Sequence, residues 1–448
     1  MRCHYRCSCF TVLLVAAATS CVLAQNPIIR NQFTADPAAR VFGDSVYLYP
    51  SHDILATEGR GRPGWFCMED YHVFSSANLV DWKDDGVILS QTTVPWADPR
   101  AYALWAPDCV SRNGKFFFYF PAPAKDTTHG RGFSIGVAVA EKPWGPFTPQ
   151  PAPIDGVRGI DPNPFIDDDG QAYLYWAGWG FQVAKLKANM VELDGRPQPI
   201  AGLPTAGLKE GPYVFKRNGK YYLTYPHVQN KTERLEYAIG ESPTGPFTVA
   251  GVIMDESSEC WTNQQSIIEF KNQWYLFYHH NDLSPNFDKN RSVRIDSLFF
   301  NDDGTIRKVI PTLRGVGATE ASREIQIDRY SARSERGVST EFLDTLNTFG
   351  GWKTVLDTAG AWIQYNSVDF GGRPLASVSI RVRSATGGAL QVRVDRSDGP
   401  LLAAVAVPGG HEWTVVKAGL SNLQPGIHNL RVLLEQDAEV EIDWVSFE

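Results

Sequence analysis

The stretch Gly159–Gly178, GIDPNPFIDDDGQAYLYWAG, sets an aspartate before a proline and then, after an Asp-Gly turn, continues into a strand rich in aromatic residues. Asp-Gly ahead of strand-forming residues is a strong hairpin signal. The same pattern of a turn residue followed by an aromatic strand occurs five times, and its turn markers are Gly43, Gly114, Gly170, Gly219 and Asn272. The chain therefore contains a repeat with a period of 49 to 71 residues.

Repeated antiparallel sheets of about this length are typical of propeller blades. The five repeats predict five blades over roughly residues 30–315, with an ordinary β-sandwich as the alternative. Three acids, Asp36, Asp161 and Glu210, lie seven to nine residues before their turn markers, where the innermost strand of a blade begins near the axis. We therefore expect them to converge, although Asp-Pro and Glu-Gly taken singly are also ordinary turn dipeptides.

Three converging carboxylates fit two kinds of site. One is a hard-cation site, because oxygen ligands suit calcium, and the other is a general acid and base pair. Carboxylates on two sides of a glycosidic bond carry out glycoside hydrolysis. Aromatic residues make up 12% of the chain and suit contact with sugar rings, whereas the net charge of -8 gives no support for a nucleic-acid partner.

The segments FTADPAARVFGDSVYLYPSHD, LWAPDCV, GIDPNPFIDDDGQAYLYWAG, LKEGPYVFKRNGKYYLTY and NDDGTIRKVIPT resemble glycoside hydrolase family 43 over roughly residues 27–316. The resemblance implies a five-bladed propeller that hydrolyses plant polysaccharide side chains and oligosaccharides with inversion at the anomeric carbon. It implies that Asp36 is the general base that activates water and that Glu210 is the general acid that protonates the leaving oxygen. It makes Asp161 the third acid, which orients Glu210 and raises its pKa.

Further residues are expected to bind the substrate. Trp105 is either a platform under the sugar or a core tryptophan, and Arg294 in NRSVRID resembles a substrate-binding arginine of the family, with a surface arginine as the alternative. Gln265 lies in TNQQSI, where many relatives carry a histidine. Because glutamine cannot change its charge, this departure bears on metal binding and on substrate choice. Trp65 and Asp70 either line the pocket or belong to an ordinary strand.

From residue 322 onward the chain changes to short alternating strands such as SVSIRVRS and ALQVRVD, which are typical of an antiparallel sandwich. GAWIQYNSVDFGG and the terminal IDWVSFE resemble carbohydrate-binding module family 6, a jelly roll, over roughly residues 324–448. Trp352 and Trp413 are candidates for sugar contact, and a domain that only supports the propeller is the alternative. The expected fold is all-β, with a propeller over residues 25–321 and a β-sandwich over 322–448.

The two resemblances also suggest metal ligands. Some members of the hydrolase family hold calcium near the axis with help from a histidine, which makes His279 in FYHHNDLS a candidate. Modules of the second family often have a structural calcium site, for which Asp443 is a candidate and Asp328 its partner. A purely structural role for His279 is the alternative. We expect no required cofactor.

Arg2 and Arg6 precede the apolar run FTVLLVAAATSCVLA, which predicts a signal peptide over residues 1–24, cleaved after Ala24. Lipidation of Cys21, as in a bacterial lipoprotein, is the alternative. No later stretch is apolar enough to span a membrane. We therefore expect a secreted or periplasmic protein.

Together these features predict a secreted inverting exo-glycosidase that removes terminal sugars from plant cell-wall glycans, with α-L-arabinofuranosyl groups as the leading substrate. A β-xylosidase or an exo-galactanase of the same fold is one alternative. The other is a glycan-binding propeller without catalysis, in which at least one of the three acids would be missing or misplaced. The expected partner is a plant polysaccharide or oligosaccharide.

Overall fold

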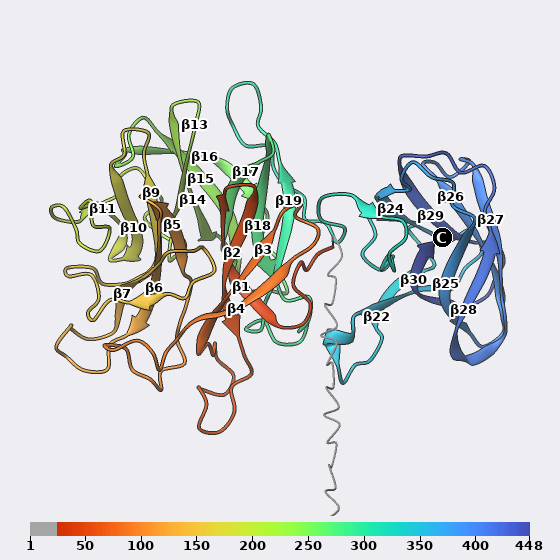
Figure 1. Ribbon diagram of the computed structural model, residues 1–448, viewed down its shortest axis with the longest axis horizontal. Coiled ribbons are helices and arrows are strands. Elements are labelled where there is room, and N and C mark those ends of the chain that lie inside the picture. Colours follow the sequence, from red (N-terminus) through yellow and green to blue (C-terminus); the bar gives the residue numbers. More distant parts are fainter. Residues whose placement is uncertain (1–24) are drawn as a thin grey trace, which may run out of the picture.

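The computed structural model describes residues 25–448, so the predicted signal peptide over 1–24 lies outside the described part. Within that part the regular elements are β-strands and one short 3-10 helix, Thr348–Gly350, and no helix is long and apolar enough to cross a membrane. Figure 1 shows a larger N-terminal body and a smaller C-terminal body. The chain is all-β, as predicted.

The N-terminal body consists of five antiparallel sheets, each formed by consecutive strands. The innermost strands contact one another in a closed ring, in the order β1, β5, β9, β13, β17 and back to β1. The first two sheets are β1 (Phe33–Phe42), β2 (Ser45–Asp53), β3 (Asp70–Ser76), β4 (Lys83–Ser90), and β5 (Asp108–Arg112), β6 (Lys115–Pro123), β7 (Phe133–Ala140), β8 (Thr148–Pro149). The third and fourth are β9 (Ile160–Ile166), β10 (Ala172–Gly178), β11 (Gly180–Leu186), β12 (Gln198–Pro199), and β13 (Tyr213–Arg217), β14 (Lys220–Val228), β15 (Glu233–Gly240), β16 (Phe247–Met254). The fifth is β17 (Ser266–Phe270), β18 (Gln273–His280) and β19 (Ser292–Leu298).

The core of this propeller is a ring of apolar interfaces between neighbouring sheets. Each of five buried clusters joins side chains of two adjacent sheets. Tyr49 of the first sheet, for example, lies against Phe118 of the second, with ring centroids 5.8 Å apart. Sheets that radiate from an axis leave wide gaps toward the outside, and large aromatic side chains fill them. This explains the aromatic strands of the repeat.

The segment that precedes β1 joins the first sheet to the last. The backbone N–H of Ile28 donates to the carbonyl oxygen of Val293 on β19 at 3.0 Å. The buried Asn26 side chain donates to the carbonyl oxygens of Ile295 (3.0 Å) and Thr312 (2.9 Å) and accepts from the N–H of Ile295 (2.8 Å). The ring of sheets is therefore closed by the N-terminal segment of the domain.

The C-terminal body is a sandwich of two sheets around one apolar core. One sheet contains β20 (Thr319–Glu320), β24 (Trp362–Asp369), β29 (Ile427–Leu434), β26 (Gly388–Val394), β27 (Leu401–Val407) and, beside β24, β21 (Ala332–Arg333). The other contains β22 (Val338–Phe342), β23 (Trp352–Leu356), β30 (Val440–Phe447), β25 (Ser377–Ser384) and β28 (Gly410–Gly419). Thr319 and Glu320, which the sequence boundary assigned to the propeller, already pair with β24 of the sandwich.

The two bodies contact each other through Trp352. Its ring is covered by the guanidinium groups of Arg30 from the propeller and Arg329 from the sandwich, at 5.2 and 3.7 Å from the ring centroid. Trp352 is only 5% exposed, so it is an interface residue and not an open platform for a sugar. Trp413 stays partly exposed and lies beside Arg381 and Arg383.

Closure of the ring through Asn26 leads to a prediction on stability. The substitution Asn26→Ala removes the side chain that satisfies two buried carbonyls and one N–H. Because buried polar groups left without a partner are costly, we expect a loss of about 3 kcal/mol in the free energy of unfolding, seen as a lower Tm. The control Asn189→Ala, which removes only exposed contacts to Glu192 and to the N–H of Val191, should change it by less than about 0.5 kcal/mol. Equal Tm values for the two variants would contradict the role of Asn26.

Candidate active site

A pocket of about 220 Å³ lies where the innermost strands of the propeller begin. Asp36, Asp161 and Glu210 all line it, so the structure brings together the three acids that the repeat singled out. Arg291 and Gln264 line it as well. The remaining lining residues are mostly apolar or aromatic: Trp65, Phe66, Met68, Trp105, Ala106, Ile160, Trp261 and Thr262.

The two Asp-Pro sequences aim their carboxylates through the same backbone device. Asp36 and Asp161 both have a left-handed backbone, with φ of 47° and 57°. Strand pairing is interrupted at both sites, between Ala35 and Ala38 on β1 and next to Asp161 on β9, opposite Tyr175–Ala177. Such bulges redirect a side chain, and backbone strain of this kind is concentrated at functional sites. The recurrence of Asp-Pro at equivalent blade positions thus has a structural cause.

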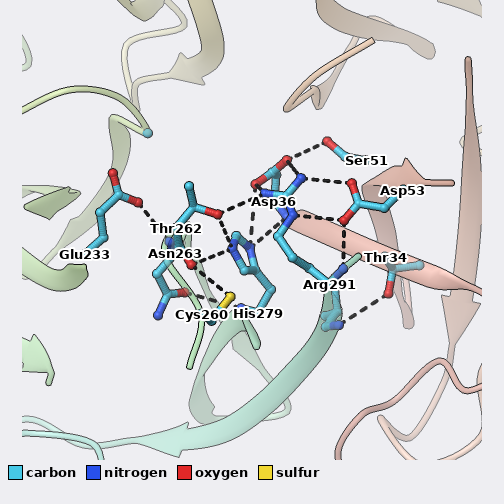
Figure 2. A network of polar contacts seen from close by, with 12 residues as sticks. Thr34, Asp36, Ser51, Asp53, Glu233, Cys260, Thr262, Asn263, His279 and Arg291 are labelled. Atoms are coloured by element: carbon cyan, nitrogen blue, oxygen red, sulfur yellow. Dashed lines mark hydrogen bonds and ion pairs between the residues drawn. The ribbon is translucent and has the colours of Figure 1, made fainter. Parts of the chain in front are cut away.

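Asp36 is held at three points (Figure 2). The hydroxyl of Ser51 donates to its Oδ2 at 2.7 Å, and Arg291 donates to both carboxylate oxygens, at 2.7 and 3.1 Å. Its backbone N–H donates to Nδ1 of His279 at 3.1 Å. Charge-assisted hydrogen bonds from an arginine stabilise a carboxylate in its charged form. The arrangement therefore presents Asp36 as a fixed anion.

Arg291 is shared between two buried aspartates. Its Nε and Nη2 donate to Oδ2 and Oδ1 of Asp53, each at 2.9 Å, while Nη1 and Nη2 reach Asp36. Burial alone would lower the pKa of Arg291, but the two carboxylates raise it above its ordinary value. The guanidinium is therefore charged and held in one orientation, and it forms part of the pocket wall.

The structure turns Arg294, the arginine expected to bind substrate, away from the pocket. Its Nε donates to Oδ2 of Asp282 at 2.8 Å, and it is absent from the residues that line the described pocket. Arg291 takes that place. The two lie three residues apart, Arg291 directly before β19 and Arg294 within it, and because successive residues of an extended chain point to opposite faces, only one of them faces the axis. The motif NRSVRID contains both arginines, and no local pattern in it distinguishes one from the other.

Gln265 also differs from its expected place. Its amide donates to the carbonyl oxygen of Gly211 and to the hydroxyl of Thr224, both at 3.0 Å, so it supports the backbone next to Glu210. Its neighbour Gln264 lines the pocket. Trp105 both lines the pocket and packs on Phe133, with ring centroids 4.5 Å apart, so its ring borders the cavity and is also part of the packing around it.

Aromatic rings form one wall of the pocket. Phe66 and Trp261 stack with ring centroids 6.1 Å apart, and Trp65 lies 6.2 Å from Trp261. Trp65 was a sequence candidate, whereas Trp261 was missed because it lies in a loop, SSECWTN, with no strand pattern. Asp70, the other candidate of that segment, is absent from the pocket lining and contacts His52 instead.

Burial raises the pKa of Glu210 to about 7, and the charge of Asp36 adds to the increase while Arg291 opposes it. Burial also raises the pKa of Asp161 well above its ordinary value, with further increases from Glu210 and Asp36, although the N–H of Gly211 donates to its Oδ2 at 2.8 Å. Carboxylates that cannot all ionise together share protons. Glu210 and Asp161 therefore retain a proton between them near neutral pH, beside the charged Asp36.

A further acid close to this site, Glu233, was missed by the sequence analysis. It is 4% exposed, and its pKa is raised well above the ordinary value by burial and then by Glu210. The N–H of Asn263 donates to its Oε2 at 2.8 Å, and Figure 2 shows the chain of contacts that leads from it through His279 to Asp36. Glu233 opens an outer strand in the plain sequence TERLEYAIG, so no turn or repeat marker distinguishes it.

The two metal-ligand candidates do not fit a calcium site as they lie. His279 accepts from Asp36 through Nδ1 and donates through Nε2 to the carbonyl oxygen of Thr262 at 3.0 Å, so both ring nitrogens are used, and burial lowers its pKa well below the ordinary value. Asp443 pairs with Arg381. Asp328, its expected partner, accepts from Arg329 at 2.8 Å. Arginine side chains thus neutralise both aspartates of the sandwich.

Comparison with known proteins agrees with this architecture. Residues 24–306 match the family described as Glycosyl hydrolases family 43, and residues 330–448 match Carbohydrate binding module (family 6). "Xylosidase/arabinosidase 43A" of Humicola insolens is 38% identical over 329 residues, covering 62% of this chain and 98% of that protein. "Arabinoxylan arabinofuranohydrolase" of Bacillus subtilis is 29% identical over 94% of this chain and 92% of its own length.

Solved structures lead to the same families. The GH43_1 enzyme of Xanthomonas citri complexed with xylose is 36% identical, with a TM-score of 0.58 over 65% of this chain and 94% of that one. The Bacillus subtilis arabinoxylan arabinofuranohydrolase in complex with cellotetraose is 25% identical, with a TM-score of 0.56 over 95% and 99%. Fold and site thus define a propeller glycoside hydrolase with an attached sandwich module. The chain belongs to glycosyl hydrolases family 43, and its C-terminal domain to carbohydrate binding module family 6.

The raised pKa of Glu210 predicts that the free energy of unfolding depends on pH. Since the pKa rises from 4.5 in the unfolded chain to about 7 in the folded one, stability is lost as pH rises through that window. Glu210→Gln removes this ionisable group. The free energy of unfolding of the variant should therefore exceed that of the wild type by up to about 3 kcal/mol at pH 8, but by little at pH 4. Thermal unfolding of both proteins from pH 4 to 9 measures this difference. The exposed Glu192→Gln serves as control, and a Tm difference for Glu210→Gln that is independent of pH would contradict the burial of this acid.

Proposed function

We propose that this protein is an inverting exo-glycosidase that releases terminal pentosyl groups from arabinoxylan, with α-L-arabinofuranosyl groups as its main substrate. The observation that carries the proposal is the cluster of Asp36, Asp161 and Glu210 in one small pocket, with one fixed anion and one shared proton. This is the combination of base and acid that glycoside hydrolysis requires.

In the proposed reaction, Glu210 donates its proton to the glycosidic oxygen as the bond to the anomeric carbon breaks. A water molecule attacks that carbon from the opposite face, and Asp36 accepts the proton that this water releases. The products are the free sugar with inverted configuration and the shortened glycan. Asp161 lies beside Glu210 and holds the backbone N–H of Gly211, so it orients the acid and keeps its pKa high.

The shape of the pocket supports removal of end groups. Its volume of about 220 Å³ is below the roughly 300–1,000 Å³ of pockets for drug-sized ligands, which suits one sugar ring. The aromatic wall of Phe66, Trp105 and Trp261 offers apolar faces to that ring, and Arg291 places a positive charge beside it. A single terminal residue fits such a site better than the middle of a chain.

The choice of sugar rests on the relatives. The protein whose likeness extends over 94% of this chain, sandwich included, is an arabinoxylan arabinofuranohydrolase, which favours arabinofuranosyl groups. The propeller alone is more similar to proteins called xylosidase/arabinosidase, which keeps β-xylosidase activity as the second candidate. With the predicted signal peptide, we propose that the enzyme acts outside the cytoplasm.

The test is hydrolysis of 4-nitrophenyl α-L-arabinofuranoside, 4-nitrophenyl β-D-xyloside and arabinoxylan by the wild type, Asp36→Asn and Glu210→Gln. We expect a preference for the arabinoside and a loss of 10² to 10⁴ in kcat for each variant, the usual contribution of general acid–base catalysis. The loss in Glu210→Gln should be smaller on the activated aryl glycoside, because its leaving group needs less protonation.

A matched control exists in Asp98, another Asp-Pro that lies outside the residues lining the pocket. Asp98→Asn should retain wild-type rates. A higher kcat/KM on the xyloside would make the enzyme a β-xylosidase. A folded wild type that cleaves none of the three substrates would contradict the proposal and favour the glycan-binding propeller.

The pH dependence of the rate tests the two remaining roles. Because the acid must be protonated, kcat/KM should fall about tenfold per pH unit above pH 7, where Glu210 ionises. Asp161→Asn removes the carboxyl group with which Glu210 shares a proton, so the alkaline limb should move to lower pH. Rate profiles from pH 4 to 9 measure both effects. A limb that stays at the wild-type pH in Asp161→Asn would show that Asp161 does not tune the acid.

A further inference from the structure

Outside the catalytic pocket, two histidines and two carboxylates gather on the first sheet of the propeller. They are His52 at the end of β2, Asp70 and His72 at the start of β3, and Asp84 on β4. One ligand atom from each of His52, Asp70 and His72 lies within 4.8 Å of the other two. Within residues 25–448 this is the group of three His, Cys or carboxylate side chains that comes close enough to hold an ion.

The strand pattern separates this cluster from the pocket. Ser51 and Asp53, the neighbours of His52, point inward and hold Asp36 and Arg291. Because side chains alternate along a strand, His52 points to the other face of β2. Asp70 and His72 are two residues apart on β3 and therefore share one face. None of the three lines the described pocket, so hydrolysis of the glycan does not use them.

The contacts within the cluster prepare nitrogen and oxygen lone pairs for an ion. Nδ1 of His72 lies 3.0 Å from Oδ1 of Asp84, so this carboxylate accepts the Nδ1 proton and leaves Nε2 with a free lone pair. Nδ1 of His52 lies 2.6 Å from Oδ1 of Asp70, and the two rings meet edge to face with centroids 4.8 Å apart. For His72, whose Nδ1 faces the carboxylate of Asp84, this is the usual arrangement of a metal-ligating histidine.

Exposure and ligand chemistry point to a particular class of ion. The side chains of His52, Asp70 and His72 are 16 to 17% exposed, so an ion can enter while most of its surroundings are already formed. Imidazole nitrogens with a carboxylate oxygen suit zinc and similar transition metals, whereas calcium and magnesium prefer oxygen alone. Zinc bonds to nitrogen are roughly 2.0–2.1 Å long, so the three side chains would close in on the ion as it binds.

We propose that His52, Asp70 and His72 bind a divalent transition-metal ion, zinc fitting best, with Asp84 as the carboxylate that orients His72. A water molecule would complete a four-coordinate shell. The ion would link β2 to β3 directly behind the residues that hold Asp36 and Arg291. Its role is therefore structural, and its binding does not depend on which sugar the enzyme releases.

The experiment uses the untagged protein, freed of metal by chelation, titrated with zinc chloride in a calorimeter and with cobalt(II), whose visible absorption reports tetrahedral nitrogen ligation. We expect one equivalent of zinc to bind and to raise Tm by at least about 2 °C. His52→Ala and His72→Ala should abolish the cobalt bands. Asp84→Asn keeps all three ligands and should weaken zinc binding by 10- to 100-fold.

His428→Ala is the matched control, because His428 makes a similar contact to Asp395, at 2.9 Å, but lies in the sandwich without a second histidine in its group. It should bind zinc as the wild type does. Absence of zinc binding by the wild type would overturn the proposal, as would unchanged binding in His52→Ala and His72→Ala. Should either alanine variant fail to fold, unchanged zinc affinity in Asp84→Asn would overturn it instead.

Discussion

The interaction on which the rest of the site depends is the ion bridge from Asp53 through Arg291 to Asp36. Both aspartates belong to the first sheet of the propeller, and the arginine precedes the last strand of the fifth. Buried charges are tolerated only when they are paired and hydrogen-bonded, so the first and last sheets have to meet in one register for the bridge to form. Closure of the ring of sheets therefore also fixes the Asp36 carboxylate in its orientation.

The ring form also explains how four acids can lie in one site. Asp36 and Asp161 lie on the innermost strands of the first and third sheets, and Glu210 lies just before the innermost strand of the fourth, so all three line one pocket. Glu233 opens an outer strand of the fourth sheet, and Glu210 contributes to its raised pKa. One arginine cannot neutralise four carboxylates. Burial and the neighbouring carboxylates both favour the protonated form of the remaining acids, so the pKa values of Asp161, Glu210 and Glu233 are all raised. Retention of protons is thus a property of the whole cluster.

The sequence allowed the fold class, the repeat and the three pocket acids to be predicted, because the hairpin markers and the Asp-Pro and Glu-Gly dipeptides before them are local signals that recur at similar spacing. It could not assign the correct arginine, since Arg291 and Arg294 differ only in which face of a strand they occupy. It placed Gln265 in the pocket where Gln264 lies, for the same reason. Glu233 and Trp261 carried no local signal at all, because their role arises from long-range contacts. Side-chain direction and loop position were thus the limits of the prediction.

The position of Arg291 has a consequence for the order in which the protein becomes competent. Synthesis proceeds from the N-terminus, so Asp36, Asp161 and Glu210 are all made about eighty residues or more before the arginine. Until the fifth sheet is complete, the two aspartates of the first sheet have no cation to face and the N-terminal segment has no β19 to pair with. An emerging chain therefore carries every proposed catalytic carboxylate without an assembled site. The proposed active site is assembled only when the fifth sheet of the propeller is complete.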